Sequence, residues 1–72
     1  MSINTIKNII KGNWHEIKGK VCATWGQITD DEIAQLDGEA EQLSGLIEKK
    51  YGYTKERADQ EIADFAKAHG WK

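Results

Sequence analysis

The chain has 72 residues with 10 basic and 12 acidic side chains, and its formal net charge is −2. This length predicts one domain over residues 1–72, because a chain this short cannot build a second hydrophobic core. The single cysteine excludes an internal disulfide, and the absence of a secretory leader pattern or a long apolar run predicts a cytoplasmic protein without integral membrane association.

Apolar residues recur at helical spacing from the beginning of the chain. Ile3, Ile6 and Ile10 are separated by steps of three and four residues. This spacing predicts a first helix over residues 3–11, which Gly12 would end.

A second stripe of apolar side chains predicts a helix over residues 13–25. Its members are Trp14, Ile17, Val21 and Trp25. Asn13 precedes the stripe and Glu16 follows it by three residues, a spacing typical of a capping box. Gly26 would end this helix.

The third predicted helix is the longest and covers residues 30–51. Thr29 and Glu32 form a second capping-box pattern, and Asp30 and Asp31 between them complement the helix dipole. The apolar stripe that follows is unbroken in helical register, at Ile33, Leu36, Ala40, Leu43 and Ile47. The sequence therefore favours one continuous helix, and a kink or break at Gly38 is the competing interpretation.

A fourth helix is predicted over residues 55–69. Gly52 supplies a left-handed end for the preceding helix, and Thr54 caps the new one. The expected buried face comprises Ala58, Ile62, Phe65 and Ala66. Gly70 and Trp71 repeat the glycine–aromatic ending of Gly52 and Tyr53.

Six of the seven glycines follow a regular spacing. Gly12, Gly19 and Gly26 are seven residues apart, and Gly38, Gly45 and Gly52 repeat this pattern 26 residues later. The repeat indicates two similar helical units. A glycine inside a helix costs about 1 kcal/mol relative to alanine. We therefore expect Gly19, Gly38 and Gly45 to mark a close backbone approach or a bend, so that leucine at Gly19 or Gly45 would damage folding.

Charge is distributed unevenly along the chain. Residues 1–28 carry a net charge of +3, whereas residues 29–64 carry −7. The four lysines of the first part, Lys7, Lys11, Lys18 and Lys20, form a candidate partner surface for a protein or a nucleic acid. The isoelectric point of about 5.6 argues against a dedicated nucleic-acid binder. The alternative explanation is charge complementarity within the molecule, or charged side chains that serve only solvation.

The sequence contains no catalytic, cofactor-binding or metal-binding motif. Cys22 has Lys18 one turn before it and His15 two turns before it, and a neighbouring cation can lower a thiol pKa. No further residue stands at a spacing diagnostic of a nucleophilic thiol. We therefore expect a protein that is not an enzyme, needs no cofactor and has no small-molecule substrate.

The ordered motifs of the chain resemble those of the CsbD-like (YjbJ-like) family over about residues 4–66. The resemblance is carried by Gly12-x-Trp14, Lys18-Gly19-Lys20, Trp25-Gly26-x-Ile28-Thr29-Asp30-Asp31-Glu32, Leu36-Asp37-Gly38, Leu43-x-Gly45 and Tyr51-Gly52-Tyr53. Cys22 and Leu46 depart from the family pattern, because charged residues are usual at these positions.

The resemblance implies a small bacterial protein linked to general stress responses, in a family with no established biochemical activity. It also implies an all-α fold of four helices, arranged as two roughly orthogonal αα-hairpins similar to SAM-like domains. The corresponding function is non-enzymatic binding or protection of other macromolecules, through a partner that the sequence does not identify. The alternative is an adaptor that binds a specific partner through the basic N-terminal half.

Overall fold

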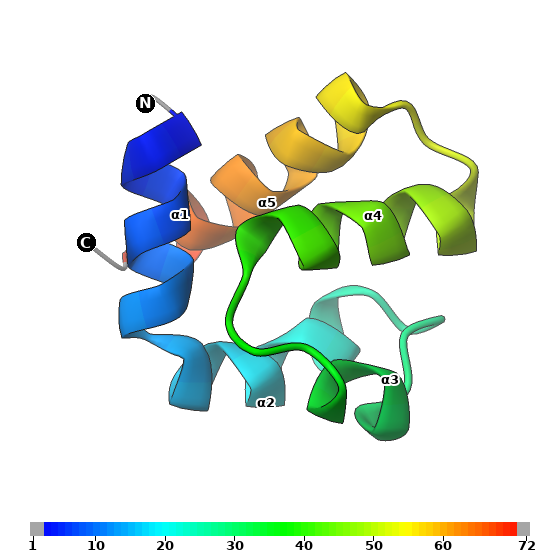
Figure 1. Ribbon diagram of the computed structural model, residues 1–72, viewed down its shortest axis with the longest axis horizontal. Coiled ribbons are helices and arrows are strands. Elements are labelled where there is room, and N and C mark those ends of the chain that lie inside the picture. Colours follow the sequence, from blue (N-terminus) through cyan, green and yellow to red (C-terminus); the bar gives the residue numbers. More distant parts are fainter. Residues whose placement is uncertain (1–2, 71–72) are drawn as a thin grey trace.

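The computed structural model describes residues 3–70, and within this range the regular structure is helical throughout (Figure 1). Its elements are α1 (Ile3–Gly12), α2 (Trp14–Thr24), α3 (Asp30–Ala34), α4 (Ala40–Tyr51) and α5 (Lys55–His69). The predicted all-α class is confirmed. The number of helices is not, because the described residues form five helices where the sequence predicted four.

The difference lies between α3 and α4, where the predicted continuous helix over residues 30–51 is wrong. The chain leaves helical geometry after Ala34 and re-enters it at Ala40. Between them Gly38 has a φ of +80°, a left-handed conformation that glycine adopts without steric cost. The competing interpretation, a break at Gly38, is the correct one.

Gly38 also lies directly against the junction of α1 and α2. A Cβ atom built on it would be 3.3 Å from Cγ of Trp14 and 3.7 Å from Cα of Lys11. The backbone conformation and the tight contact therefore both require glycine here. Figure 1 shows the connection between α3 and α4 passing this junction before it reaches the first turn of α4.

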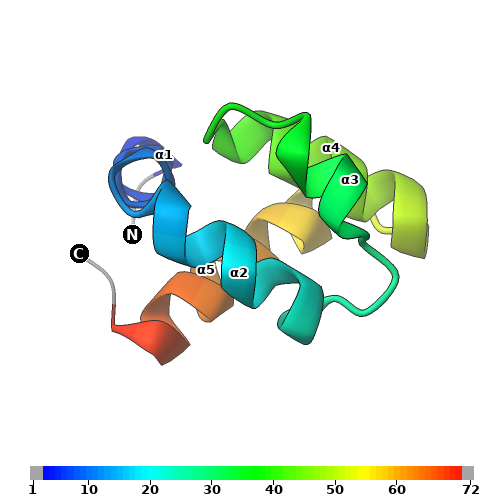
Figure 2. The same ribbon diagram turned by 90° about the horizontal axis from the view of Figure 1, so that it is seen from below.

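The helices form two layers. α4 and α5 pack side by side as a hairpin, while α2 packs on α3 below them (Figure 1). α1 closes one end and contacts α2, α4 and α5. The view from below shows α2 and α3 in front of the α4–α5 hairpin (Figure 2). The more specific expectation of two orthogonal, SAM-like hairpins stays a prediction.

The hydrophobic core lies between these layers and receives side chains from every described helix. Its largest fully buried apolar side chains are Ile10, Ile17, Val21, Leu43, Ile47 and Ile62. Trp25 contributes a ring whose centroid lies 4.9 Å from that of Phe65 on α5. Burying an aliphatic or aromatic side chain of this size stabilises the fold by about 1.5–3 kcal/mol. The apolar stripes of the sequence therefore identify the core, although Trp14 and Leu36 are only half-buried.

Several helix ends follow the sequence closely. The Thr29 hydroxyl accepts a hydrogen bond from the Glu32 amide at 3.3 Å, and the Thr29 amide donates to Glu32 Oε1 at 3.1 Å. Thr54 accepts from the Arg57 amide at 3.2 Å. Gly52 and Gly70 have φ values of +70° and +71°, as left-handed helix ends require. Trp71, predicted to follow this last stop, lies outside the described residues.

The predicted capping box at Asn13 is wrong. The Asn13 side chain makes no capping hydrogen bond to α2; its Nδ2 instead donates to the carbonyl oxygen of Ile9 at 2.9 Å. Only one residue separates α1 from α2. The side chain of Asn13 therefore serves the end of α1, whose last carbonyl groups need donors, while its backbone carbonyl accepts hydrogen bonds from the Glu16 and Ile17 amides at the start of α2.

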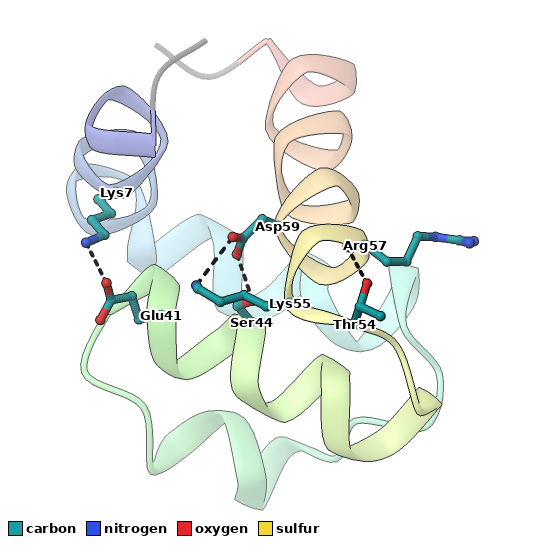
Figure 3. Close-up of polar contacts among 7 residues, drawn as sticks. All are labelled: Lys7, Glu41, Ser44, Thr54, Lys55, Arg57 and Asp59. Carbon is teal, nitrogen blue, oxygen red and sulfur yellow. Dashed lines mark hydrogen bonds and ion pairs between the residues drawn. The ribbon is translucent and has the colours of Figure 1, made fainter.

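A buried polar contact joins the two helices of the hairpin. Ser44 on α4 is almost fully buried, and its hydroxyl donates to Asp59 Oδ1 on α5 at 2.8 Å. Lys55 Nζ lies 3.4 Å from the other oxygen of the same carboxylate (Figure 3). Because the buried hydroxyl has an acceptor, this polar group does not penalise the packing of α4 on α5.

The expectation of a close backbone approach at Gly19 and Gly45 is wrong. A Cβ atom on either residue would have no neighbour within 4 Å outside its own helix, and both positions are exposed. At these positions the molecule has room for a larger side chain.

Alanine at Gly45 should therefore stabilise the protein by about 0.5–1 kcal/mol, because the helical backbone suits alanine and the unfolded chain loses freedom. Denaturation by urea, followed by circular dichroism, measures the change. Gly52→Ala is the matched control: its surroundings are equally open, but its φ of +70° opposes a side chain, so it should lose stability. A loss of stability in Gly45→Ala would contradict the conclusion that position 45 has room for a side chain.

Candidate partner surface

Lys7 is engaged within the molecule. Its Nζ lies 2.7 Å from Oε1 of Glu41, so the ion pair joins α1 to the first turn of α4 (Figure 3). The hydrogen bond to Glu41 raises the pKa of Lys7, and the same contact lowers the pKa of Glu41. The side chains remain 38% and 64% exposed. Such an exposed pair orients the elements but contributes little net stability.

Lys11 is exposed in the last turn of α1 and lies beside the acidic connection. Gly38 packs against its backbone, and the negative charge of Glu39 also raises the pKa of Lys7. The connection thus passes the last turn of α1, and the charge of Glu39 acts on Lys7. This arrangement supports internal charge complementarity for the α1 part of the predicted surface.

Lys18 and Lys20 are exposed on α2. Side chains two residues apart on a helix do not face each other, so these two lysines project from different flanks of α2. Lys18 lines a hollow between α2 and α3, whereas Lys20 is not part of its lining. The structure therefore does not bring the four predicted lysines together in one patch.

The hollow between α2 and α3 has a volume of about 290 Å³. Its lining comprises Lys18, Gly19, Asp30, Ile33 and Ala34. Ile33 and Ala34 of α3 thus lie opposite Gly19 of α2, which has no side chain. Lys18 and Asp30 line the same hollow with opposite charges. The sequence does not reveal this hollow, because a glycine inside a helix, such as Gly19, also fits a close backbone contact.

Cys22 lies at the same junction and is half-buried. Its Sγ donates a hydrogen bond to Asp30 Oδ1 at 3.1 Å. This bond, together with partial burial and the negative charge of Asp30, raises the pKa of the thiol. The effect of Asp30 thus opposes the activation by Lys18 that the sequence left open, and the thiol stays protonated at neutral pH.

Cys22 should consequently react with iodoacetamide more slowly at pH 7 than a free thiol does, because the thiolate is the nucleophile. Asp30→Asn removes the charge that raises the pKa and should make the reaction faster. Asp31→Asn changes the same charge one residue away and serves as the control. A rate for Asp30→Asn equal to that of the control would show that the hydrogen bond does not protect the thiol.

A second ion pair links α3 to the last turn of α4. Lys50 Nζ lies 2.7 Å from Oε2 of Glu32, the residue that also completes the capping box with Thr29. The hydrogen bond from Lys50 is the largest cause that lowers the pKa of Glu32, and the bond from the Thr29 amide adds to it. One carboxylate therefore fixes both the start of α3 and its position against α4.

The stability that Glu32 provides should depend on pH. Its pKa is lower in the folded protein than its ordinary value of 4.5, so the stabilisation is present above 4.5 and is lost as the pH falls through the folded-state pKa. Glu32→Gln keeps the capping pattern without the charge. The difference in Tm between the protein and this variant should narrow as the solution is acidified below pH 4.5.

Lys50→Met supplies the control for this pH series, because it removes the largest cause of the pKa shift. In that background the effect of Glu32→Gln on Tm should be smaller at neutral pH. A Tm difference that stays constant across the acid range would contradict the role of the ion pair.

The two tyrosines that flank Gly52 are also held by neighbours. The Tyr51 hydroxyl oxygen accepts a hydrogen bond from the backbone amide of Gln27 at 3.2 Å, which links the connection after α2 to the end of α4. Tyr53 stacks on Tyr51 with ring centroids 5.5 Å apart, and the Arg57 guanidinium lies 4.5 Å from the Tyr53 centroid. These aromatic rings stabilise the turn between α4 and α5.

Among residues 3–70, no group of three or more histidine, cysteine or carboxylate side chains is arranged to hold a metal ion. None of the helices in the described part of the chain is long and apolar enough to cross a bilayer.

These features define a small all-helical protein with a half-exposed junction between α2 and α3. The model of the family described as CsbD-like matches residues 8–60. The chain belongs to the CsbD-like family, as its motifs predicted.

Curated relatives agree with this assignment. The chain is 46% identical to the UPF0337 protein PA4738 of Pseudomonas aeruginosa over 59 residues, which cover 82% of this chain and 91% of that protein. It is 47% identical to a UPF0337 protein of Bordetella pertussis over 81% of this chain and 88% of the relative. Identity to the UPF0337 protein YjbJ of Escherichia coli K12 is 44%, over 75% and 78% of the two chains.

Proposed function

We propose that the protein acts without catalysis, by binding and protecting another macromolecule in the bacterial cytoplasm during stress. The stress role follows what the family resemblance implies. The observation that carries the binding role is the outward side of α2, where Gly19 and Ala23 are exposed beside Lys18 and Lys20. Small residues let a partner approach the helix closely, and the adjacent hollow offers apolar contact.

The electrostatics of this side favour an acidic partner. Lys7 is paired with Glu41, whereas the structure gives no ion pair within 4 Å for Lys18 or Lys20 among the described residues. A surface with unpaired lysines attracts negative charge and raises the rate of association with it. Because the isoelectric point of the chain is about 5.6, we propose an acidic protein surface as the partner rather than a nucleic acid.

A photo-crosslinking amino acid at Ala23 tests this proposal in stressed cells. The same amino acid at Ala68, exposed on α5, is the matched position away from the surface. We expect discrete protein adducts from position 23 and not from position 68. Reversing the charge of both lysines, Lys18→Glu with Lys20→Glu, should lower the yield of these adducts at least about tenfold. The Tm should change little, since both side chains are exposed.

Lys49→Glu with Lys67→Glu provides the charge-matched control, because both lysines are exposed on α4 and α5. This variant should keep the adducts. Adducts that survive reversal at Lys18 and Lys20 would remove α2 as the contact surface. Adducts that disappear after nuclease treatment would favour the nucleic-acid alternative, and a turnover activity lost on a point substitution would overturn the non-enzymatic role.

A further inference from the structure

The backbone of the connection between α3 and α4 is not helical, although the spacing of its apolar residues is helical. Residues 35–39 are not helical, yet the apolar stripe passes through them in helical register. If residues 30–51 formed one helix, the side chains of Ile33, Leu36, Ala40, Leu43 and Ile47 would share one face. The segment is therefore suited to two backbone arrangements, the observed broken form and a continuous helix.

The broken form depends on few local contacts. The amides of Gln35 and Leu36 still donate back into α3, at 3.3 and 3.0 Å, and Leu43 donates to the Glu39 carbonyl at 3.1 Å as α4 begins. Between these points the left-handed Gly38 turns the chain against Trp14. A continuous helix would give the amides of residues 37–42 helical acceptors and would lose the Gly38 contact.

Straightening this connection would separate α1–α3 from α4–α5 within one chain. The contacts across that boundary include the Trp25–Phe65 rings at 4.9 Å, the Lys7–Glu41 and Glu32–Lys50 ion pairs at 2.7 Å, and the Gln27–Tyr51 hydrogen bond at 3.2 Å. The core is also shared between the two parts. An opened chain on its own would expose this core, and the surface that fits it best belongs to another opened copy.

We propose that residues 35–39 are a hinge through which two copies exchange their α4–α5 hairpins. Each copy then has one helix over residues 30–51, and its α1–α3 part packs on the hairpin of the other copy. All the contacts across the boundary re-form between chains, and only the hinge itself changes. Glycine at position 38 opposes this exchange, because it suits the left-handed turn and is a poor helix former.

Gly38→Ala reverses both preferences and is the principal test. Alanine strains the turn at φ +80°, meets Trp14 Cγ at 3.3 Å, and favours the continuous helix. Because both effects act in each of two chains, we expect the dissociation constant of the dimer to fall by at least about 100-fold. Size-exclusion chromatography with light scattering after refolding at high protein concentration measures the dimer, and circular dichroism measures the added helix.

Gly45→Ala is the matched control, because it makes the same substitution inside α4, where nothing lies within 4 Å. It should leave the protein as monomeric as the unchanged chain. Asp37→Ala is a second hinge variant: the side chain is exposed, so the substitution raises helix propensity without disturbing Gly38. It should increase the dimer fraction to a smaller extent than Gly38→Ala.

Exchange is distinguished from side-by-side association by mixing two chains, Lys7→Glu and Glu41→Lys, each with Gly38→Ala. In an exchanged homodimer of either variant, positions 7 and 41 of the two copies carry like charges, whereas in the exchanged heterodimer both of these pairs are opposite in charge. Heterodimers should therefore exceed the statistical half when the mixture is refolded at low salt. A statistical mixture would overturn the exchange.

A Gly38→Ala protein that folds as a monomer with unchanged helix content would also overturn the proposal, as would equal dimerisation of Gly45→Ala. If Gly38→Ala fails to fold, Asp37→Ala provides the test of the hinge. A dimer fraction of Asp37→Ala no larger than that of the unchanged chain, refolded at the same concentration, would then rule the hinge out.

Discussion

The left-handed backbone at Gly38 is the constraint on which the arrangement of the helices depends. It turns the chain against Trp14 at the α1–α2 junction and directs α4 back across the molecule. This return brings Glu41 to Lys7 at one end of α4 and Lys50 to Glu32 at the other. It also places the α4–α5 hairpin over the apolar side chains of the first part, where the core forms.

The turn at Gly38 also explains part of the uneven charge distribution in the sequence. The turn brings Glu39 and Glu41 near Lys7 of α1, and Glu41 forms an ion pair with it. Lys18 and Lys20 of α2 are exposed and have no ion pair within 4 Å among the described residues. Internal complementarity and an external binding surface are therefore not exclusive explanations: α1 supports the first, and α2 is the basis of the second.

Features that depend on neighbouring residues could be predicted from the sequence. The caps at Thr29 and Thr54 and the left-handed end at Gly52 follow from hydrogen bonds within one turn, so local spacing determines them. Local spacing does not determine the role of Asn13, because the same side chain can serve the helix before it or the helix after it. The choice depends on how closely α1 and α2 follow each other.

Features that depend on distant residues could not be predicted. The apolar register of residues 30–51 is the same in a broken and a continuous helix, and only the contact with Trp14 separates them. Lys7 and Glu41 are 34 residues apart, so no local pattern reveals their pairing. The hollow beside Gly19 exists because α3 packs on α2 without filling the position above the glycine. The sequence shows that Gly19 has no side chain, but not whether a neighbouring element fills the space.

The division of the core between α1–α3 and the α4–α5 hairpin also has a consequence for synthesis of the chain. Residues 3–34 leave the ribosome before the α4–α5 hairpin that covers Ile17, Val21 and Trp25. At about 5–20 residues per second, the nascent chain spends seconds with this apolar surface uncovered.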